Sequence, residues 1–103
     1  MVIIKEPINF QWDTGNLGKN KKSHNVAEKE AEEVFFDKKK RTFKDHVHSK
    51  KEERFRVIGK SKQKRLLFIV FTVRLGRIRI ISARDTNRKE VSLYEEKTNT
   101  TKI

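Results

Sequence analysis

The residues of this sequence best suited to chemistry are its arginines, and most of them fall in one stretch. Between Arg54 and Arg84 the chain carries ten Lys or Arg side chains and no acidic residue. A guanidinium group is a planar fork whose donors match two phosphate oxygens at once. This stretch therefore predicts a surface that binds phosphates. The competing interpretation is that the arginines form the solvated face of a sheet, although neighbouring cations on one face would repel one another.

The histidines and glycines indicate much less. His46 and His48 are only half of a metal site, and no Cys or repeated His/carboxylate spacing completes it. The four glycines are scattered, so neither a phosphate-binding loop nor a dinucleotide fingerprint is present. No nucleophilic serine motif is recognisable either. We therefore expect no metal and no cofactor.

Composition limits the class of protein further. The chain has 103 residues and a formal net charge of +12, with 26 Lys+Arg against 14 Asp+Glu. This length fits a single domain over residues 1–103. The absence of Cys excludes disulfides and fits a reducing cytoplasm, the expected location. The longest apolar run, residues 66–71, is too short to span a membrane, and the N-terminus lacks the pattern of a secretory signal.

The first half of the chain is expected to be mainly helical. Residues 8–12 alternate as a half-buried strand does, and Asp13 is expected to cap a weakly helical segment. Residues 26–36 should form an amphipathic helix, because apolar residues recur at helical spacing there. Residues 38–41 form a cationic connection, and residues 42–49 are compatible with either a short strand or a loop.

The second half predicts an antiparallel meander. Alternation over residues 54–58 indicates a strand, residues 59–64 a turn, and residues 66–71 a central strand covered on both faces. A turn at Leu75-Gly76 leads into residues 77–82.

The alternation in residues 77–82 places Arg77 and Arg79 on one face of the sheet and Ile78 on the other. Asp85 or Thr86 is expected to cap a last helix that contains Tyr94, before a frayed end. The predicted fold is α+β, with N-terminal helices packed on an antiparallel meander and a short C-terminal helix.

As a set, these residues resemble the BrnT family of type II toxins nearly end to end. The matching blocks are Phe10-Gln11-Trp12-Asp13, Asn20, His24-Asn25-Val26, Glu30-Ala31, Val34-Phe35, His48-Ser49, Glu52-Glu53-Arg54, Ile58-Gly59, Arg65-Leu66-Leu67, Thr72, Arg74, Ile78 to Arg84, Arg88, Glu90 and Tyr94-Glu95. One departure is Ser23-His24-Asn25-Val26, where the family usually has Lys-His-Gly-Val. Lys22 is a candidate replacement for the missing cation, and Asn25 should tolerate the left-handed backbone that glycine adopts.

The resemblance implies a RelE-like fold and a ribonuclease that inhibits translation. It also implies a BrnA-type antitoxin that sequesters the toxin, in a heterotetramer that meets DNA only through the antitoxin. The implied reaction is metal-independent cleavage of RNA, in which the ribose 2′-OH attacks the adjacent phosphate; DNA lacks this hydroxyl.

Residue roles follow from this reaction. Arg74 and Arg84, which match family positions, are expected to stabilise the charge that develops on the phosphate. His48 and Glu53 are candidates for moving the proton, with His24 third. The alternative for Glu53 is an ion pair with Arg54 or Arg56, and for His48 a loop cap with Ser49. The residues expected to bind RNA are Lys22, His24, Arg54, Arg65, Arg77, Arg79 and Tyr94.

Two other functions remain open on the sequence alone. The first is a basic protein that blocks nucleic acid or the ribosome by occupancy, without catalysis. The second is a degenerate toxin that acts only with its antitoxin.

Overall fold

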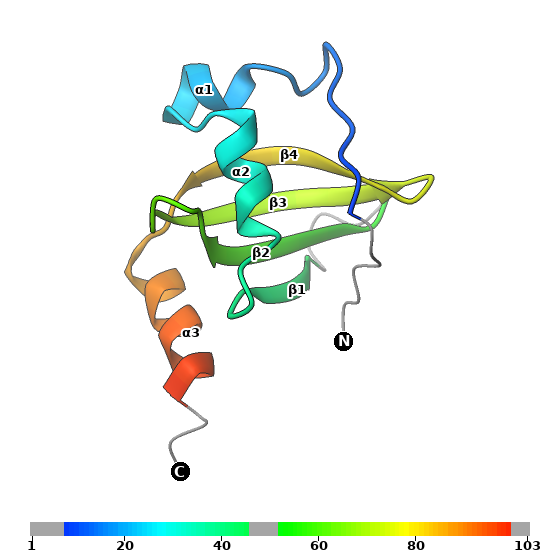
Figure 1. The fold of residues 1–103 in the computed structure, drawn as a ribbon. Helices are drawn as coiled ribbons and strands as arrows, with labels where there is room; N and C mark the ends of the chain where they lie inside the picture. Colours follow the sequence, from blue (N-terminus) through cyan, green and yellow to red (C-terminus); the bar gives the residue numbers. More distant parts are fainter. Residues whose placement is uncertain (1–7, 46–51, 100–103) are drawn as a thin grey trace.

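A computed structural model describes residues 8–45 and 52–99 of the chain. Four strands pair in sequence order in one antiparallel sheet (Figure 1): β1 (Arg41–Asp45), β2 (Arg54–Lys60), β3 (Leu66–Arg74) and β4 (Arg77–Asp85). Helices α1 (Lys19–His24) and α2 (Glu28–Val34) precede the sheet, and α3 (Arg88–Asn99) follows it. The α+β class is thereby confirmed. None of the helices in the described part of the chain is long and apolar enough to cross a membrane.

The meander has one strand more than the three expected, because residues 41–45 pair with β2. The turn at Leu75-Gly76 is confirmed: both residues have positive φ, 51° and 76°, as a two-residue hairpin turn of type I′ requires. The predicted turn at residues 59–64 begins too early. Gly59 is a buried strand residue, and the turn is closed between Ser61 and Arg65.

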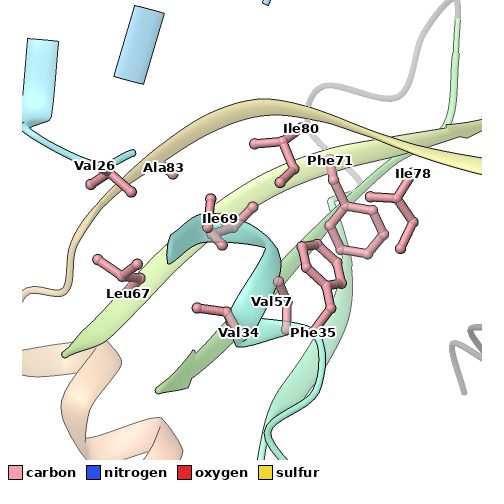
Figure 2. Packing of buried hydrophobic residues seen from close by; sticks show 11 residues of the cluster. Val26, Val34, Phe35, Val57, Leu67, Ile69, Phe71, Ile78, Ile80 and Ala83 are labelled. Carbon is pink, nitrogen blue, oxygen red and sulfur yellow. The ribbon is translucent and has the colours of Figure 1, made fainter. Parts of the chain in front are cut away.

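The hydrophobic core lies between α2 and one face of the sheet (Figure 2). Helix α2 falls within the predicted residues 26–36 and buries Ala31 and Val34. Phe35, directly after it, packs edge-on against Phe71 of β3, with ring centroids 5.0 Å apart. Val26, ahead of α2, also belongs to this core. Strands β2, β3 and β4 contribute the other side chains, which are Val57, Leu67, Ile69, Ile78, Ile80 and Ala83.

The prediction that β3 is covered on both faces is wrong. Along this strand Leu67, Ile69 and Phe71 are buried, whereas Phe68 and Val70 remain partly exposed. Helix α2 covers only the first set. The apolar run from residue 66 to residue 71 therefore places alternate side chains in the core and on a partly solvated face.

The N-terminal segment covers the free edge of β4. Only Phe10 of the predicted strand at residues 8–12 forms a bridge, in parallel with Ile78. Further along, the side chain of Asn16 donates to the Ile80 carbonyl, and the Asn20 side chain accepts from the Ala83 amide. The unpaired backbone groups of an edge strand are satisfied in this way.

Both predicted helix caps are wrong. Gly18, not Asp13, precedes α1. Asp13 instead begins the turn ahead of the helix, where its carboxylate accepts hydrogen bonds from the Gly15 amide and from Arg79. At α3 the cap is Asn87 rather than Asp85 or Thr86. Its side chain accepts from the Glu90 amide, and the Glu90 side chain accepts from the Asn87 amide. This reciprocal arrangement is a capping box.

Candidate nucleic-acid interface

The strand register places most arginines of the sheet on the face opposite α2, called here the open face. Residues directly opposite one another on paired strands share a face. The open face therefore includes the row of Arg56, Val70 and Ser82 and the pair of Phe68 and Arg84. Because side chains alternate along β2 and β3, every second residue before and after these on the two strands also lies on the open face, and so do their partners on β1 and β4. The arginines of this face are Arg41, Arg54, Arg56, Arg74, Arg77, Arg79 and Arg84. The predicted separation of Arg77 and Arg79 from Ile78 is confirmed by the burial of Ile78.

One cluster of these cations lies where the β3–β4 hairpin turns. Arg74 forms two hydrogen bonds with Glu52, of 2.6 and 2.9 Å. The hydrogen bond from Arg74 holds the pKa of Glu52 below its usual value, and the charges of Arg54 and Arg79 lower it further. Arg77 lies opposite Arg74 and is exposed. Four arginines, which are Arg54, Arg74, Arg77 and Arg79, therefore gather at this end of the face.

Arg79 belongs to the same cluster, but its guanidinium is largely committed to the fold. It donates to Asp13 at 2.6 Å and to Asn16 at 3.4 Å, and only 12% of its side chain is exposed. The hydrogen bond from Arg79 is the main cause of the lowered pKa of Asp13. Arg79 thus fastens the N-terminal segment to the sheet as well as adding charge to the open face.

Arg84 lies at the other end of β4. Its guanidinium lies over the Phe68 ring, 4.3 Å from the centroid, and forms two hydrogen bonds with Glu90, of 2.9 and 2.8 Å. Because Glu90 also completes the cap of α3, this one carboxylate fixes both the helix start and the arginine. Arg84 is a rigidly positioned cation whose charge is balanced by its partner.

The distance between Arg74 and Arg84 limits what they can do together. Arg74 pairs with Arg77, and Arg84 pairs with Phe68, so their rows are six residues apart along β3. At about 3.3 Å per residue, this separation is about 20 Å. Each guanidinium is also held by its own carboxylate. The geometry does not support the expectation that both act on one phosphate; it supports contacts with different phosphates.

Two residues expected to bind RNA are engaged inside the protein. Arg65 bonds both oxygens of Asp85, one oxygen of Glu30, and the carbonyls of His24 and Asn25. These bonds hold the loop after α1, helix α2 and the end of β4 together.

Tyr94 is only 5% exposed, and its hydroxyl donates to Asp37. Burial and that hydrogen bond raise its pKa above the usual range. The buried ring does not face solvent, as stacking on a base would require.

The candidate proton-transfer groups are dispersed. His48 lies outside the described residues. Glu53 is exposed and forms an ion pair with Lys44 at 3.0 Å. His24 ends α1 and lies near enough to Asp85 to act electrostatically on its carboxyl, whose pKa is lowered mainly by the hydrogen bond from Arg65. His24 is therefore nearer the Arg84 end, whereas Glu53 directly precedes β2 at the Arg74 end.

The altered segment after α1 keeps its backbone shape. Asn25 has φ 56° and ψ 39°, the left-handed conformation expected of it. Its side-chain oxygen accepts a hydrogen bond from Lys21 at 2.7 Å. Lys22, the candidate replacement for the missing family cation, is exposed on α1. The substitution of the family glycine by Asn is thus accommodated without distorting the turn.

The residues expected to bind RNA included neither Arg41 nor Arg56, although Arg56 belongs to the basic stretch between Arg54 and Arg84. The guanidiniums of Arg56 and Arg41 both lie over the Phe43 ring, 5.5 and 5.2 Å from its centroid. The alternation of residues 54–58 already placed Arg54 and Arg56 on one face. What the sequence did not show was the pairing of β1 with β2, which brings Phe43 beside Arg56.

Comparison with known proteins identifies the family. A search of curated proteins gives no match. The family model described as "Ribonuclease toxin, BrnT, of type II toxin-antitoxin system" matches residues 12–90. This range covers most of the chain, including α1, α2, all four strands and the α3 cap. The chain therefore belongs to the BrnT family of ribonuclease toxins of type II toxin–antitoxin systems.

Proposed function

We propose that this toxin cleaves RNA without a metal, on its open face. The ribose 2′-oxygen attacks the adjacent phosphorus and loses its proton to a base, and the 5′-oxygen of the next nucleotide leaves and takes up a proton. The products are a 2′,3′-cyclic phosphate and a 5′-hydroxyl. The gathering of arginines on one sheet face, with the core on the other, is the observation that supports this most.

The hairpin end of the open face suits the chemical step best. Arg74 is held in place by Glu52 and lies among further cations, so it is available as a preorganised donor to the phosphorane. Glu53 lies at the same end and is a candidate base, with His48 as the second candidate. We assign Arg84 to another phosphate of the same RNA, because it lies about 20 Å away along the strand direction.

Single-turnover cleavage in EDTA tests this assignment. With saturating single-stranded RNA, Arg74→Ala should slow cleavage by about a hundredfold or more, the usual loss for one such donor. Arg84→Ala should weaken binding but leave the saturated rate nearly unchanged. Lys29→Ala removes a positive charge at an exposed position of α2, away from the open face, and is the control for lost charge. A slowed saturated rate for Arg84→Ala together with a nearly unchanged rate for Arg74→Ala would place the chemical step at the Arg84 end. His24 is the nearer candidate for proton transfer there. Matching DNA should remain intact.

Blocking by occupancy is the second candidate function, and one observation favours it. Arg74 and Arg84 are both neutralised by bidentate carboxylates in the free protein. If RNA stays intact both alone and on ribosomes, while still binding in a salt-dependent manner, occupancy replaces catalysis. If messenger RNA is cleaved only on ribosomes, the protein remains assigned as a ribonuclease, and its activity depends on the ribosome.

The partner expected for this toxin is a BrnA-type antitoxin in the cytoplasm. We infer that an acidic segment of it covers the open face and masks the arginines used for RNA, in a heterotetramer that meets DNA through the antitoxin. We also infer that the fold is RelE-like. Two helices ahead of a four-stranded antiparallel meander support this arrangement.

A further inference from the structure

Arg56 occupies the middle of the open face. It lies on β2, one of the two inner strands, in a row that crosses the sheet from Phe43 through Val70 to Ser82. All four side chains of this row are partly exposed. Along β3, the row is four residues from Arg74 and two from the row of Arg84. Arg56 therefore lies between the two ends of the face already described.

The surroundings of Arg56 differ from those of Arg74, Arg79 and Arg84. Arg74, Arg79 and Arg84 each bond a carboxylate at 2.9 Å or less. Arg56 has no carboxylate partner among the described residues. Its Nε atom is buried without a hydrogen bond. Stacking on Phe43 stabilises a guanidinium only partly, and here a second cation, Arg41, shares the same ring.

This arrangement is costly in the free protein. A partly desolvated cation without a counter-charge is unfavourable, and the second guanidinium at the Phe43 ring adds to the positive charge around it. Arg41 is anchored, since it donates to the Leu93 carbonyl, so it cannot move away without losing that bond. An anion placed at Arg56 would relieve both costs at once.

We propose that Arg56, with Phe43, Val70 and Ser82, forms a binding site for one nucleotide of single-stranded RNA. The two terminal nitrogens of Arg56 bind a phosphate oxygen each, and Phe43 and Val70 provide apolar surface for the attached sugar or base. This inference rests on the proposed function and extends it: RNA crosses the open face from Arg74 past Arg56 to Arg84. An acidic peptide is the less suitable occupant, because it would leave the apolar part of the row unused.

Binding of an uncleavable RNA tests the site separately from catalysis. Fluorescence anisotropy of a short labelled 2′-O-methyl RNA, which lacks the attacking hydroxyl, gives affinity and its salt dependence. Arg56→Gln should weaken binding by about tenfold and reduce the slope of log affinity against log salt by about 0.7, the value for one phosphate contact in a single strand. Lys29→Gln removes the same charge from α2 and should change neither.

Folding provides an independent readout. Because Arg56 has an unbonded buried Nε, the melting temperature of Arg56→Gln should equal or exceed that of the wild type. Arg56→Lys keeps the charge but loses the fork, so RNA affinity should fall between wild type and Arg56→Gln. A lowered melting temperature would show that Arg56 is structural and would overturn the proposal.

Three further results would also overturn it. One is equal RNA affinity for Arg56→Gln and Lys29→Gln. Another is that Arg56→Gln loses more affinity for a poly-glutamate peptide than for RNA, which would assign the site to an acidic peptide. The third is no measurable binding of RNA by the wild type. Cleavage of ordinary RNA by the wild type is measured in parallel, so failure of catalysis and failure of this site are distinguished.

Discussion

At the scale of single residues, Arg65 and Arg56 show two opposite uses of the same side chain. Arg65 bonds Asp85 and Glu30 and two backbone carbonyls, with 26% of its side chain exposed. Arg56 has no carboxylate partner within the described residues and lies over an aromatic ring. The first stabilises the free protein, and the second leaves an uncompensated positive charge at the surface where RNA is proposed to bind.

Arg65→Gln is expected to lower the free energy of unfolding by about 2 kcal/mol. Its removal leaves Glu30, whose side chain is 11% exposed, without its cation and breaks several hydrogen bonds. Urea unfolding measures the change, with Lys29→Gln as the control for lost charge. A loss no larger than that of the control would contradict the structural role of Arg65.

The lowered pKa of the Asp37 carboxyl predicts how the stability of the protein depends on pH. Burial alone would raise its pKa, but the amides of Lys60 and Lys39 and the Tyr94 hydroxyl donate to it, and its pKa is lowered overall. Because the folded-state pKa lies below the unfolded value of about 3.9, its stabilisation is complete above that value and is lost as pH falls through the folded pKa.

The free energy of unfolding should therefore fall from about pH 5 downward, and Asp37→Asn should make that fall shallower. Denaturant unfolding between neutral and acidic pH measures both curves. The same slope in Asp37→Asn and wild type would show that Asp37 does not contribute. Asp85 and Glu52, whose pKa values are lowered by Arg65 and Arg74, add to the fall in both proteins.

At the scale of elements, the close approach of α2 to β2 depends on Gly59. A Cβ atom there would lie 2.9 Å from Val34 Cγ1 and 3.2 Å from the Val34 carbonyl oxygen. Gly59→Ala is expected to destabilise the protein by about 1–3 kcal/mol, because α2 must move away from the sheet. Lys62→Ala, in the exposed turn, should stay within about 0.5 kcal/mol. Thermal and urea unfolding compare the two, and equal stability would contradict this packing.

Glu90 connects α3 to β4, because its side chain bonds both Arg84 of β4 and the N-terminal cap of α3. It completes the capping box with Asn87 and holds Arg84 with two hydrogen bonds. The position of Arg84 on the open face thus depends on the start of a helix that follows the sheet. This carboxylate therefore links α3 to the open face, in addition to the hydrogen bond from Arg41 to the Leu93 carbonyl of α3.

At the scale of the whole molecule, charge and core are separated by the sheet. The core cluster beneath α2 lies on one face, and the arginines lie on the other, which also carries the buried Ile58. Such a surface attracts polyanions at long range and makes association depend on salt. The same surface suits both RNA and an acidic antitoxin segment, so binding of one should exclude the other.

Arg77→Glu tests this competition at the level of the complex. Arg77 is exposed and forms no ion pair with other described residues, so its reversal leaves the fold unaltered. If the antitoxin covers the open face as proposed, its binding should weaken by roughly tenfold, mainly through slower association. Surface plasmon resonance measures the rates, and Lys29→Glu is the control for net charge. Unchanged affinity would place the antitoxin elsewhere. Arg79 is unsuitable for this test because it holds Asp13.

Several features could be predicted from the sequence because they are local. The period-two alternation of residues 77–82 placed Arg77 and Ile78 on opposite faces, and the positive φ of Gly76 and Asn25 agrees with what their residue types allow. Helical spacing located α2 within two residues of each end. The BrnT resemblance, carried by short blocks in order, was confirmed by the family match.

Only the tertiary structure decided which cations are available to a ligand. Arg79 is bonded to Asp13, and Arg65 to Asp85 and Glu30, across long stretches of chain. No local pattern encodes these partners, because they depend on how the strands pair and where the N-terminal segment lies. For the same reason the sequence did not distinguish Arg56 from the other cations of the basic stretch. The sequence determined that the sheet has a basic face, and the fold determined which of its charges are already balanced.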